Sequence, residues 1–239
     1  MRALICDIYG TLLDVGPPPP DAEALWRGLW GRHTDRPETP TLDAFHAAVD
    51  RHVAMAHVSG RQRGLVQPEV DWPELAIEAF PVLRRLSPHE RSAFFFEHAR
   101  LTRRTSLAAG AADCLRAALA RGWVLGIASN AQACTRDELA AALTPHALSL
   151  DAFRPEACYH SFLHGRAKPD PHVFQSLTAS LAALGVAPGK IVMVGDRLDN
   201  DIIPAAAAGW STWHLRPEPG DAAGPWPALE AWMGEISSS

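Results

Sequence analysis

Short apolar runs alternate with helical stretches along much of this chain, and this alternation limits the possible folds more than any other feature of the sequence. The runs RALICDI, WVLGIAS and KIVMVGD are rich in aliphatic residues, and each has a polar residue at or near its end. Such runs are typical of strands that a parallel sheet buries on both faces. Strands that alternate with helices favour right-handed crossovers, so we predict an α/β fold with helices on both faces of a parallel sheet.

The remaining elements of that fold follow from the same patterns. Two further short strands are expected over 157–163 and 211–216, and helices are expected over 108–122, 134–144, 171–185 and 199–209. The last five residues, EISSS, are expected to fray because nothing apolar ties them down.

A long helical segment interrupts the alternation near the N-terminus. The stretch GPPPPD fits neither a helix nor a central strand and marks a boundary. After it, apolar residues recur at spacings of three and four, which predicts helices over 21–33, 41–58, 71–83 and 87–102. We therefore predict two domains: an α/β core made of residues 1–16 and 107–239, and a small all-helical domain over 17–106 inserted into it.

The composition excludes several classes of function. The chain has 239 residues, of which 47% are hydrophobic and 21% charged, and its net charge is -5. No basic face is available to bind nucleic acid, and no apolar run is long enough to cross a membrane. The N-terminus lacks the pattern of a signal peptide, and the four cysteines stand far apart. We expect a cytoplasmic protein with reduced thiols and no nucleic-acid or membrane partner.

Polar residues gather where the predicted strands end. Asp7, Ser129 and Asp196 each follow an apolar run, and the carboxyl ends of parallel strands are where doubly wound sheets bind ligands. Asp201 follows shortly after Asp196 and would add a third carboxylate. Three carboxylates that close together need a positive charge beside them. Lys168 is one candidate, and Mg²⁺, which prefers carboxylate oxygens, is the other.

Each of these motifs taken alone also fits a purely structural role. DIYGT fits a turn after a strand, with Gly10 in the turn and Thr11 as a local cap. GDRLDND fits a helix entry in which Asp199 is the N-cap. A lone Lys168 is more often a solvated surface charge than part of a site. The functional interpretation rests on their joint occurrence.

In this order and at these spacings, the four motifs DIYGTLLD, IASN, AKPDP and GDRLDND resemble those of the haloacid dehalogenase superfamily of hydrolases. The resemblance covers nearly the whole chain. The helical insert after the first motif is similar to the cap domain that one class of this superfamily carries there. The resemblance implies a Rossmann-like core, a helical cap and hydrolysis through a covalent aspartyl intermediate.

The resemblance also assigns roles to individual residues. Asp7 matches the nucleophile, and Thr11 matches the loop residue that supports it. Ser129 matches the residue that hydrogen-bonds the transferred group, and Lys168 matches the cation that stabilises the nucleophile and the intermediate. Asp196 and Asp201 match the acidic positions that hold Mg²⁺, together with Asp7 and the backbone carbonyl of Tyr9.

Three features resemble the metal-independent 2-haloacid dehalogenases in particular. Tyr9 stands where phosphatases of this superfamily usually carry a second Asp that acts as general acid and base. Asn130 after Ser129 matches the dehalogenase pair SN. In the insert, ALWR is similar to the helix that supplies the halide-side arginine, which makes Arg27 a candidate substrate-binding residue.

The fourth motif points the other way. The dehalogenases have a Ser at the position of Asp196 and an Asn two residues later, where this chain has Leu198. They also have a tyrosine six residues after the motif lysine, and this chain has Phe174 there. Without a metal, an extra carboxylate beside Asp7 would repel the carboxylate of a haloacid. With Mg²⁺ the same carboxylate favours phosphoryl transfer, in which charge neutralisation dominates catalysis.

Three functions therefore stay open, in a definite order. The first is a Mg²⁺-dependent phosphatase of a small phosphorylated metabolite, and the second is a metal-independent 2-haloacid dehalogenase. The third is a weakly active or regulatory binding protein of the same fold. In each case the partner is expected to be a small molecule, and the protein a monomer or a homodimer.

Overall fold

A computed structural model describes residues 1–34, 38–215 and 223–237, and its centre is a five-stranded parallel sheet. The strands run in the order β5-β4-β1-β6-β7, and every neighbouring pair is parallel. Their bounds are β1 Ala3–Cys6, β4 Val124–Ser129, β5 Cys158–His160, β6 Ile191–Gly195 and β7 Ser211–His214. This confirms the predicted α/β class and its parallel sheet.

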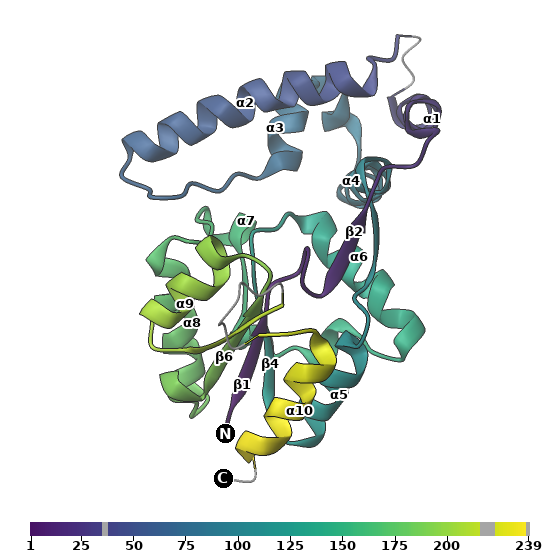
Figure 1. Cartoon of the computed structure of the whole chain (residues 1–239). Coiled ribbons are helices and arrows are strands. Elements are labelled where there is room, and N and C mark those ends of the chain that lie inside the picture. The colour runs from purple at the N-terminus through teal and green to yellow at the C-terminus, as the bar shows by residue number, and fades with distance from the viewer. Residues whose placement is uncertain (35–37, 216–222, 238–239) are drawn as a thin grey trace.

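The apolar runs bury both faces of this sheet. Along β1, Leu4 and Cys6 belong to one buried cluster, whereas Ala3 and Ile5 belong to another. The first cluster packs against α5 (Ala111–Ala120), α6 (Ala133–Leu143) and α10 (Trp226–Ser237), and the second against α8 (Pro171–Ala183) and α9 (Ile203–Ala207). Figure 1 shows α10 and α5 on one side of the sheet and α8 and α9 on the other. Alternate residues of a strand point to opposite faces, which explains why the run is apolar throughout.

The inserted segment forms a separate layer above the carboxyl ends of the strands (Figure 1). Its helices are α1 Ala22–Thr34, α2 Leu42–Gln62, α3 Trp72–Ala79 and α4 Pro88–Thr102, with a 3₁₀ turn over Pro81–Arg85. They bury a third cluster of side chains, drawn entirely from residues 26–101, in which Trp26, Phe45 and Phe94 are fully enclosed. A cluster of its own is what an independent cap needs. The exact domain limits stay a prediction.

A two-stranded antiparallel ribbon, which the sequence did not lead us to expect, joins the cap to the core. It consists of β2 (Leu13–Gly16) and β3 (Arg104–Leu107), and Gly16 is paired with Arg104. Each strand has only four residues, and neither shows the clear alternation that predicts a strand. Because the two linkers are paired, the chain enters and leaves the cap at adjacent points.

Three smaller features complete the fold. The short helix α7 (Ser161–His164) follows β5, a π turn over Leu198–Ile202 precedes α9, and 3₁₀ turns cover Thr144–His146, Leu150–Ala152, Pro155–Ala157 and Pro188–Lys190. The expected fraying of EISSS is wrong for residues 235–237, which belong to α10; Ser238 and Ser239 lie outside the described residues. Among the described helices, none is long and apolar enough to cross a bilayer.

The cap also touches the core away from the ribbon. The loop between α2 and α3 pairs with the loop after α7: the Glu69 N–H donates to the Gly165 carbonyl at 3.1 Å, and the Ala167 N–H to the Gln67 carbonyl at 3.0 Å. The side chain of Gln132, just before α6, donates to the Val70 carbonyl at 2.8 Å and accepts from the Trp72 N–H at 2.9 Å. We call residues 67–72 the cap loop.

Candidate active site

Three neighbouring strands deliver polar side chains to one edge of the sheet. Asp7 directly follows β1, and its N–H donates to the Val194 carbonyl of β6 at 3.0 Å. Asp196 directly follows β6, and Ser129 is the last residue of β4. Since β1 lies between β4 and β6, these three residues meet at the centre of the sheet, beneath the cap.

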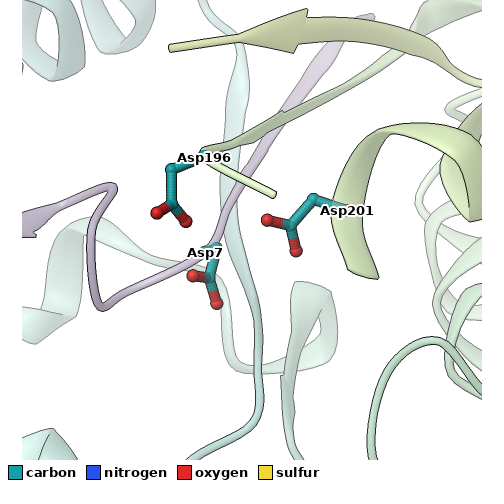
Figure 2. Close-up of side chains that lie close together, drawn as sticks. All are labelled: Asp7, Asp196 and Asp201. Atoms are coloured by element: carbon teal, nitrogen blue, oxygen red, sulfur yellow. The ribbon is translucent and has the colours of Figure 1, made fainter. Parts of the chain in front are cut away.

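Three carboxylates form the heart of this edge. Asp7, Asp196 and Asp201 each offer an oxygen, and the three oxygens lie within 4.8 Å of one another. Figure 2 shows the carboxylates of all three converging from the ends of β1 and β6 and from the helical turn that holds Asp201. Oxygen donors of this kind at this spacing fit a hard divalent cation such as Mg²⁺. That the Tyr9 carbonyl is a further ligand stays a prediction.

Two glycines make the close approach of these carboxylates possible. A Cβ on Gly10 would lie 2.3 Å from Oδ2 of Asp196, and a Cβ on Gly195 would lie 2.3 Å from Oδ2 of Asp201. Gly10 also has φ +77°, a conformation that favours glycine. Any larger residue at either position would push a carboxylate out of the cluster.

Lys168 supplies the positive charge within the cluster. Its Nζ donates to Oδ1 of Asp7 at 2.9 Å and also to Oδ1 of Asp201, and its side chain is only 3% exposed. Burial lowers the pKa of Lys168, but the charges of Asp7 and Asp201 outweigh burial and raise it above its ordinary value. Burial raises the pKa of Asp201 to about 6, against the opposing effect of Lys168. One ammonium is thus shared by two carboxylates, and Asp196 adds a further acidic group.

Asn130 holds the backbone of the lysine in place. Its side-chain amide donates to the Lys168 carbonyl at 2.9 Å, and its Oδ1 accepts from the Lys168 N–H at 2.7 Å. The predicted site residue Asn130 therefore meets the others through the main chain of Lys168.

Two predicted site residues have buried hydroxyls, one in the loop after β1 and one at the end of β4. The side-chain oxygens of Thr11 and Ser129 have no hydrogen-bond partner among the residues that the structure describes. Both side chains are about 1% exposed. A buried hydroxyl is costly to leave unpaired, so an oxygen or other acceptor of a bound substrate would satisfy it.

Tyr9 has a different environment from the one its motif suggests. Its hydroxyl contacts Thr135 at 3.0 Å and also Glu138, both on α6, and it accepts a hydrogen bond from Nη2 of Arg103 at 2.6 Å. Burial raises the pKa of Tyr9 well above its ordinary value, opposed by the charge of Arg103. The phenol is therefore protonated at neutral pH, and its hydroxyl is hydrogen-bonded to these neighbours.

Sequence reasoning missed Thr135, Glu138 and Arg103. They lie 94 or more residues from Tyr9 in the chain and belong to none of the four motifs. No signal in the sequence linked these residues to Tyr9, because Arg103 follows α4 and Thr135 and Glu138 lie on α6.

Two other residues singled out in the sequence lie away from the carboxylates. Arg27 is on α1, its side chain is 66% exposed, and its guanidinium pairs with Glu23 of the same helix. The structure does not bring Arg27 together with Asp7 and Lys168, and its role in substrate binding stays a prediction. Phe174, on α8, is buried in the apolar cluster on one face of the sheet.

One cavity of the protein is distinct from the carboxylate cluster. It has a volume of about 930 Å³ and lies between α1, α4, β3 and α6, with Arg103 and Glu138 in its wall. Neither Asp7 nor Lys168 lines it. We assign the candidate site from the carboxylates and the lysine, because these groups together offer a nucleophile, oxygen ligands for a metal ion and a positive charge.

Comparisons with known proteins agree with the α/β fold described above. A family model described as haloacid dehalogenase-like hydrolase matches residues 1–209. A HAD phosphatase from Thermococcus onnurineus is 20% identical, with a TM-score of 0.54 and 98% of each chain covered. A 2-haloacid dehalogenase from Pseudomonas syringae pv. Tomato is 19% identical, with a TM-score of 0.59, covering 97% of this chain and 100% of that one. Among curated proteins, none matches this sequence significantly.

Proposed function

Because this chain belongs to the family of haloacid dehalogenase-like hydrolases, we propose that it is a Mg²⁺-dependent phosphatase that acts on a small phosphorylated metabolite. The observation that carries the proposal is the cluster of Asp7, Asp196 and Asp201 around a single lysine. Three carboxylates against one ammonium leave an excess of negative charge, which would repel an anionic substrate. A divalent cation removes that excess.

Asp7 is the proposed nucleophile. One of its carboxylate oxygens attacks phosphorus, the bond from phosphorus to the leaving oxygen breaks, and an aspartyl phosphate forms. Water then attacks phosphorus, the bond to Asp7 breaks, and inorganic phosphate leaves with the carboxylate restored. Lys168, which donates to Asp7, holds the nucleophile and offsets charge on the transferred group.

The neighbouring groups bind and orient the substrate. Ser129 and Thr11 offer buried hydroxyls to the phosphoryl oxygens, and Asn130 keeps the lysine loop in place. Asp7, Asp196 and the Tyr9 carbonyl would hold the Mg²⁺, with Asp201 beside them. When bound, the ion supplies positive charge against the phosphoryl oxygens.

A metal-independent 2-haloacid dehalogenase is the second candidate, and Tyr9 favours it. With Tyr9 in place of an acid, the site has no obvious proton donor for an alkoxide leaving group, whereas a halide needs none. Two features weaken this candidate: the Asn130 amide is engaged by the main chain of Lys168, and Arg27 is exposed on the outer cap. A third candidate, a weakly active binding protein, would show no turnover. A cytoplasmic location and a monomeric or homodimeric state remain part of the proposal.

Turnover of two substrate classes with and without metal tests the proposal. We expect the purified protein to hydrolyse p-nitrophenyl phosphate with added Mg²⁺ and to stop when EDTA is added. Asp7→Asn, which nearly keeps the shape of the nucleophile, is expected to remain folded and inactive. Halide release from 2-chloropropionate in EDTA would instead establish the dehalogenase. No turnover of either substrate would favour the binding protein.

A further inference from the structure

Arg103 lies where the cap returns to the core. It directly follows α4, and β3 begins at the next residue. Its guanidinium grips Glu138 of α6 with two hydrogen bonds, from Nε to Oε1 at 3.1 Å and from Nη2 to Oε2 at 2.7 Å. Glu138 is almost fully enclosed, with a side chain 1% exposed, and the Arg103 side chain is 27% exposed. A two-pronged contact to a buried carboxylate is a strong and geometrically specific interaction.

Tyr9 completes this contact. The same Nη2 of Arg103 donates to the Tyr9 hydroxyl at 2.6 Å, and the guanidinium carbon lies 4.6 Å from the centre of the Tyr9 ring. A phenol has one proton, and the carboxylate of Glu138 is the strongest acceptor near it, so Tyr9 donates to Glu138 while it accepts from Arg103. Each of the three side chains therefore forms hydrogen bonds with the other two. We call Tyr9, Arg103 and Glu138 the clasp.

The clasp acts on the loop that carries the nucleophile. Tyr9 is two residues after Asp7, and its loop is closed by the Gly10 N–H to the Leu13 carbonyl and the Leu13 N–H to the Ile8 carbonyl, both 2.7 Å. Leu13 begins β2, which pairs with β3, and β3 starts directly after Arg103. The cap linker therefore holds the nucleophile loop by two routes, through the β2–β3 ribbon and through the clasp.

We infer that Arg103 and Glu138 are positioning residues for hydrolysis, which fix Tyr9 and thereby set the position of Asp7 relative to the linker of the cap. Neither side chain needs to touch the substrate for this. This inference rests on the proposed function only in the experiment that measures turnover. A change in the cap linker moves Arg103 directly, so the geometry couples the cap to the nucleophile at this point.

A surface ion pair of the cap provides a matched comparison. Arg32 of α1 pairs with Glu97 of α4, and both side chains are about half exposed. This pair has the same arginine–glutamate chemistry as Arg103 and Glu138 of the clasp, and all four side chains line the same cavity. Exposed pairs of this kind contribute little to stability. Arg32→Gln therefore controls for a general loss of cap charge.

Kinetics of three variants give the first test. We expect Arg103→Gln to lower kcat about tenfold to a hundredfold with KM changed less than threefold, because small displacements of a nucleophile are costly for the chemical step. Arg103→Lys restores charge but not the two-pronged geometry, and is expected to recover part of the loss. Arg32→Gln should match the wild type. A folded Arg103→Gln variant with wild-type kcat would overturn the inference.

Hydrogen exchange gives a second test that needs no activity. In Arg103→Gln, and to a smaller extent in Tyr9→Phe, the amides of Gly10 and Leu13 are expected to exchange at least tenfold faster, while those of β4 and β6 stay unchanged. Tyr9→Phe keeps the ring and the fold, so it covers the case in which Arg103→Gln fails to fold. Unchanged exchange in a folded Tyr9→Phe and Arg103→Gln pair would refute the clasp. Faster exchange in a protein that hydrolyses neither substrate class would leave the clasp standing and refute the proposed function.

Discussion

The lack of a side chain at Gly10 makes room for the carboxylate of Asp196. It has φ +77°, and a Cβ there would collide with Asp196 at 2.3 Å. Gly122, in the turn before β4, has nearly the same φ of +70°, but a Cβ there would meet nothing within 4 Å. Substitution at either glycine carries the same backbone strain, so the difference between them isolates the effect on the carboxylate cluster.

We predict that Gly10→Ala weakens Mg²⁺ binding at least tenfold, because the new methyl group displaces Asp196 from the cluster. Gly122→Ala should keep the affinity and lose about 1 kcal/mol of unfolding free energy through strain alone. Calorimetric Mg²⁺ titrations, with urea unfolding of both variants, check this. Equal affinity in the two variants would mean that Asp196 is not a ligand.

At the scale of single residues, the sequence predicted the site residues that lie within the short motifs and none of those that lie outside them. Asp7, Ser129 and Asp196 could be placed because each lies at the end of a recognisable apolar run, and parallel strands bring their ends together. Arg103 and Glu138 could not, because their meeting with Tyr9 depends on how α4 and α6 pack in three dimensions. A motif read along the chain carries no information on such a contact.

The helix α4 buries a histidine in the aromatic core of the cap. His98 is 6% exposed, stacks on Trp72 with ring centres 5.1 Å apart, and has its Nε2 2.9 Å from Nε2 of His46. Burial lowers the pKa of His98 to about 3, and the charges of His46 and Arg103 act in the same direction. The imidazole is therefore neutral in the folded protein at neutral pH.

The protein is expected to lose stability as the pH falls below about 6.5. His98 takes up a proton near that pH when unfolded but not until about pH 3 when folded, so the unfolded state binds more protons in between. Between pH 7 and pH 5 this lowers the unfolding free energy by about 2 kcal/mol. His98→Gln should remove this contribution to the slope and leave that of His160, whose pKa burial lowers to about 4, whereas His89→Gln, at an exposed histidine of the same helix, should leave the slope unchanged. Urea unfolding at both pH values measures it, and identical slopes in all three proteins would contradict it.

The elements themselves were largely foreseeable, with two instructive exceptions. The cap helices and the core strands have clear periodicities, and most appear within a few residues of their predicted ranges. The strands β2 and β3 were missed because each is four residues long and stabilised by a partner far away in the chain. The helix α10 was missed although Trp226, Leu229 and Met233 are buried at helical spacings, a signal that was present.

At the scale of the whole molecule, the cap loop determines how the cap closes over the core. The Glu69 carboxylate accepts from the Ser161 hydroxyl at 2.6 Å, from the Val70 N–H at 2.9 Å and from the Gln132 amide at 3.3 Å. The Ser161 hydroxyl in turn accepts a hydrogen bond at 2.9 Å from the N–H of Ala131, which is next to Asn130. One acidic side chain thus connects the cap to the loops that carry Asn130 and Lys168.

We predict that Glu69→Ala loosens the cap on the core. The amides of Glu69 and Ala167, which form the backbone pairing between the cap loop and the core, should exchange faster, and the radius of gyration in solution should increase. Glu78→Ala, at a cap residue that pairs only with His52 of α2 among the described residues, serves as the control. Exchange that is equally slow in both variants would show that Glu69 does not hold the cap.

The position of β1 at the centre of the sheet has a consequence for synthesis of the protein. This strand is synthesised before both of its partner strands, because Ala3 pairs with Val124 on one side and with Ile191 on the other. A nascent chain therefore carries an apolar strand with open edges until most of the polypeptide has emerged, a state prone to aggregate. The cap helices, whose buried cluster is contiguous in sequence, can assemble in the meantime. Asp196 joins Asp7 only when β6 docks, so the carboxylate cluster cannot form until β6 has been synthesised.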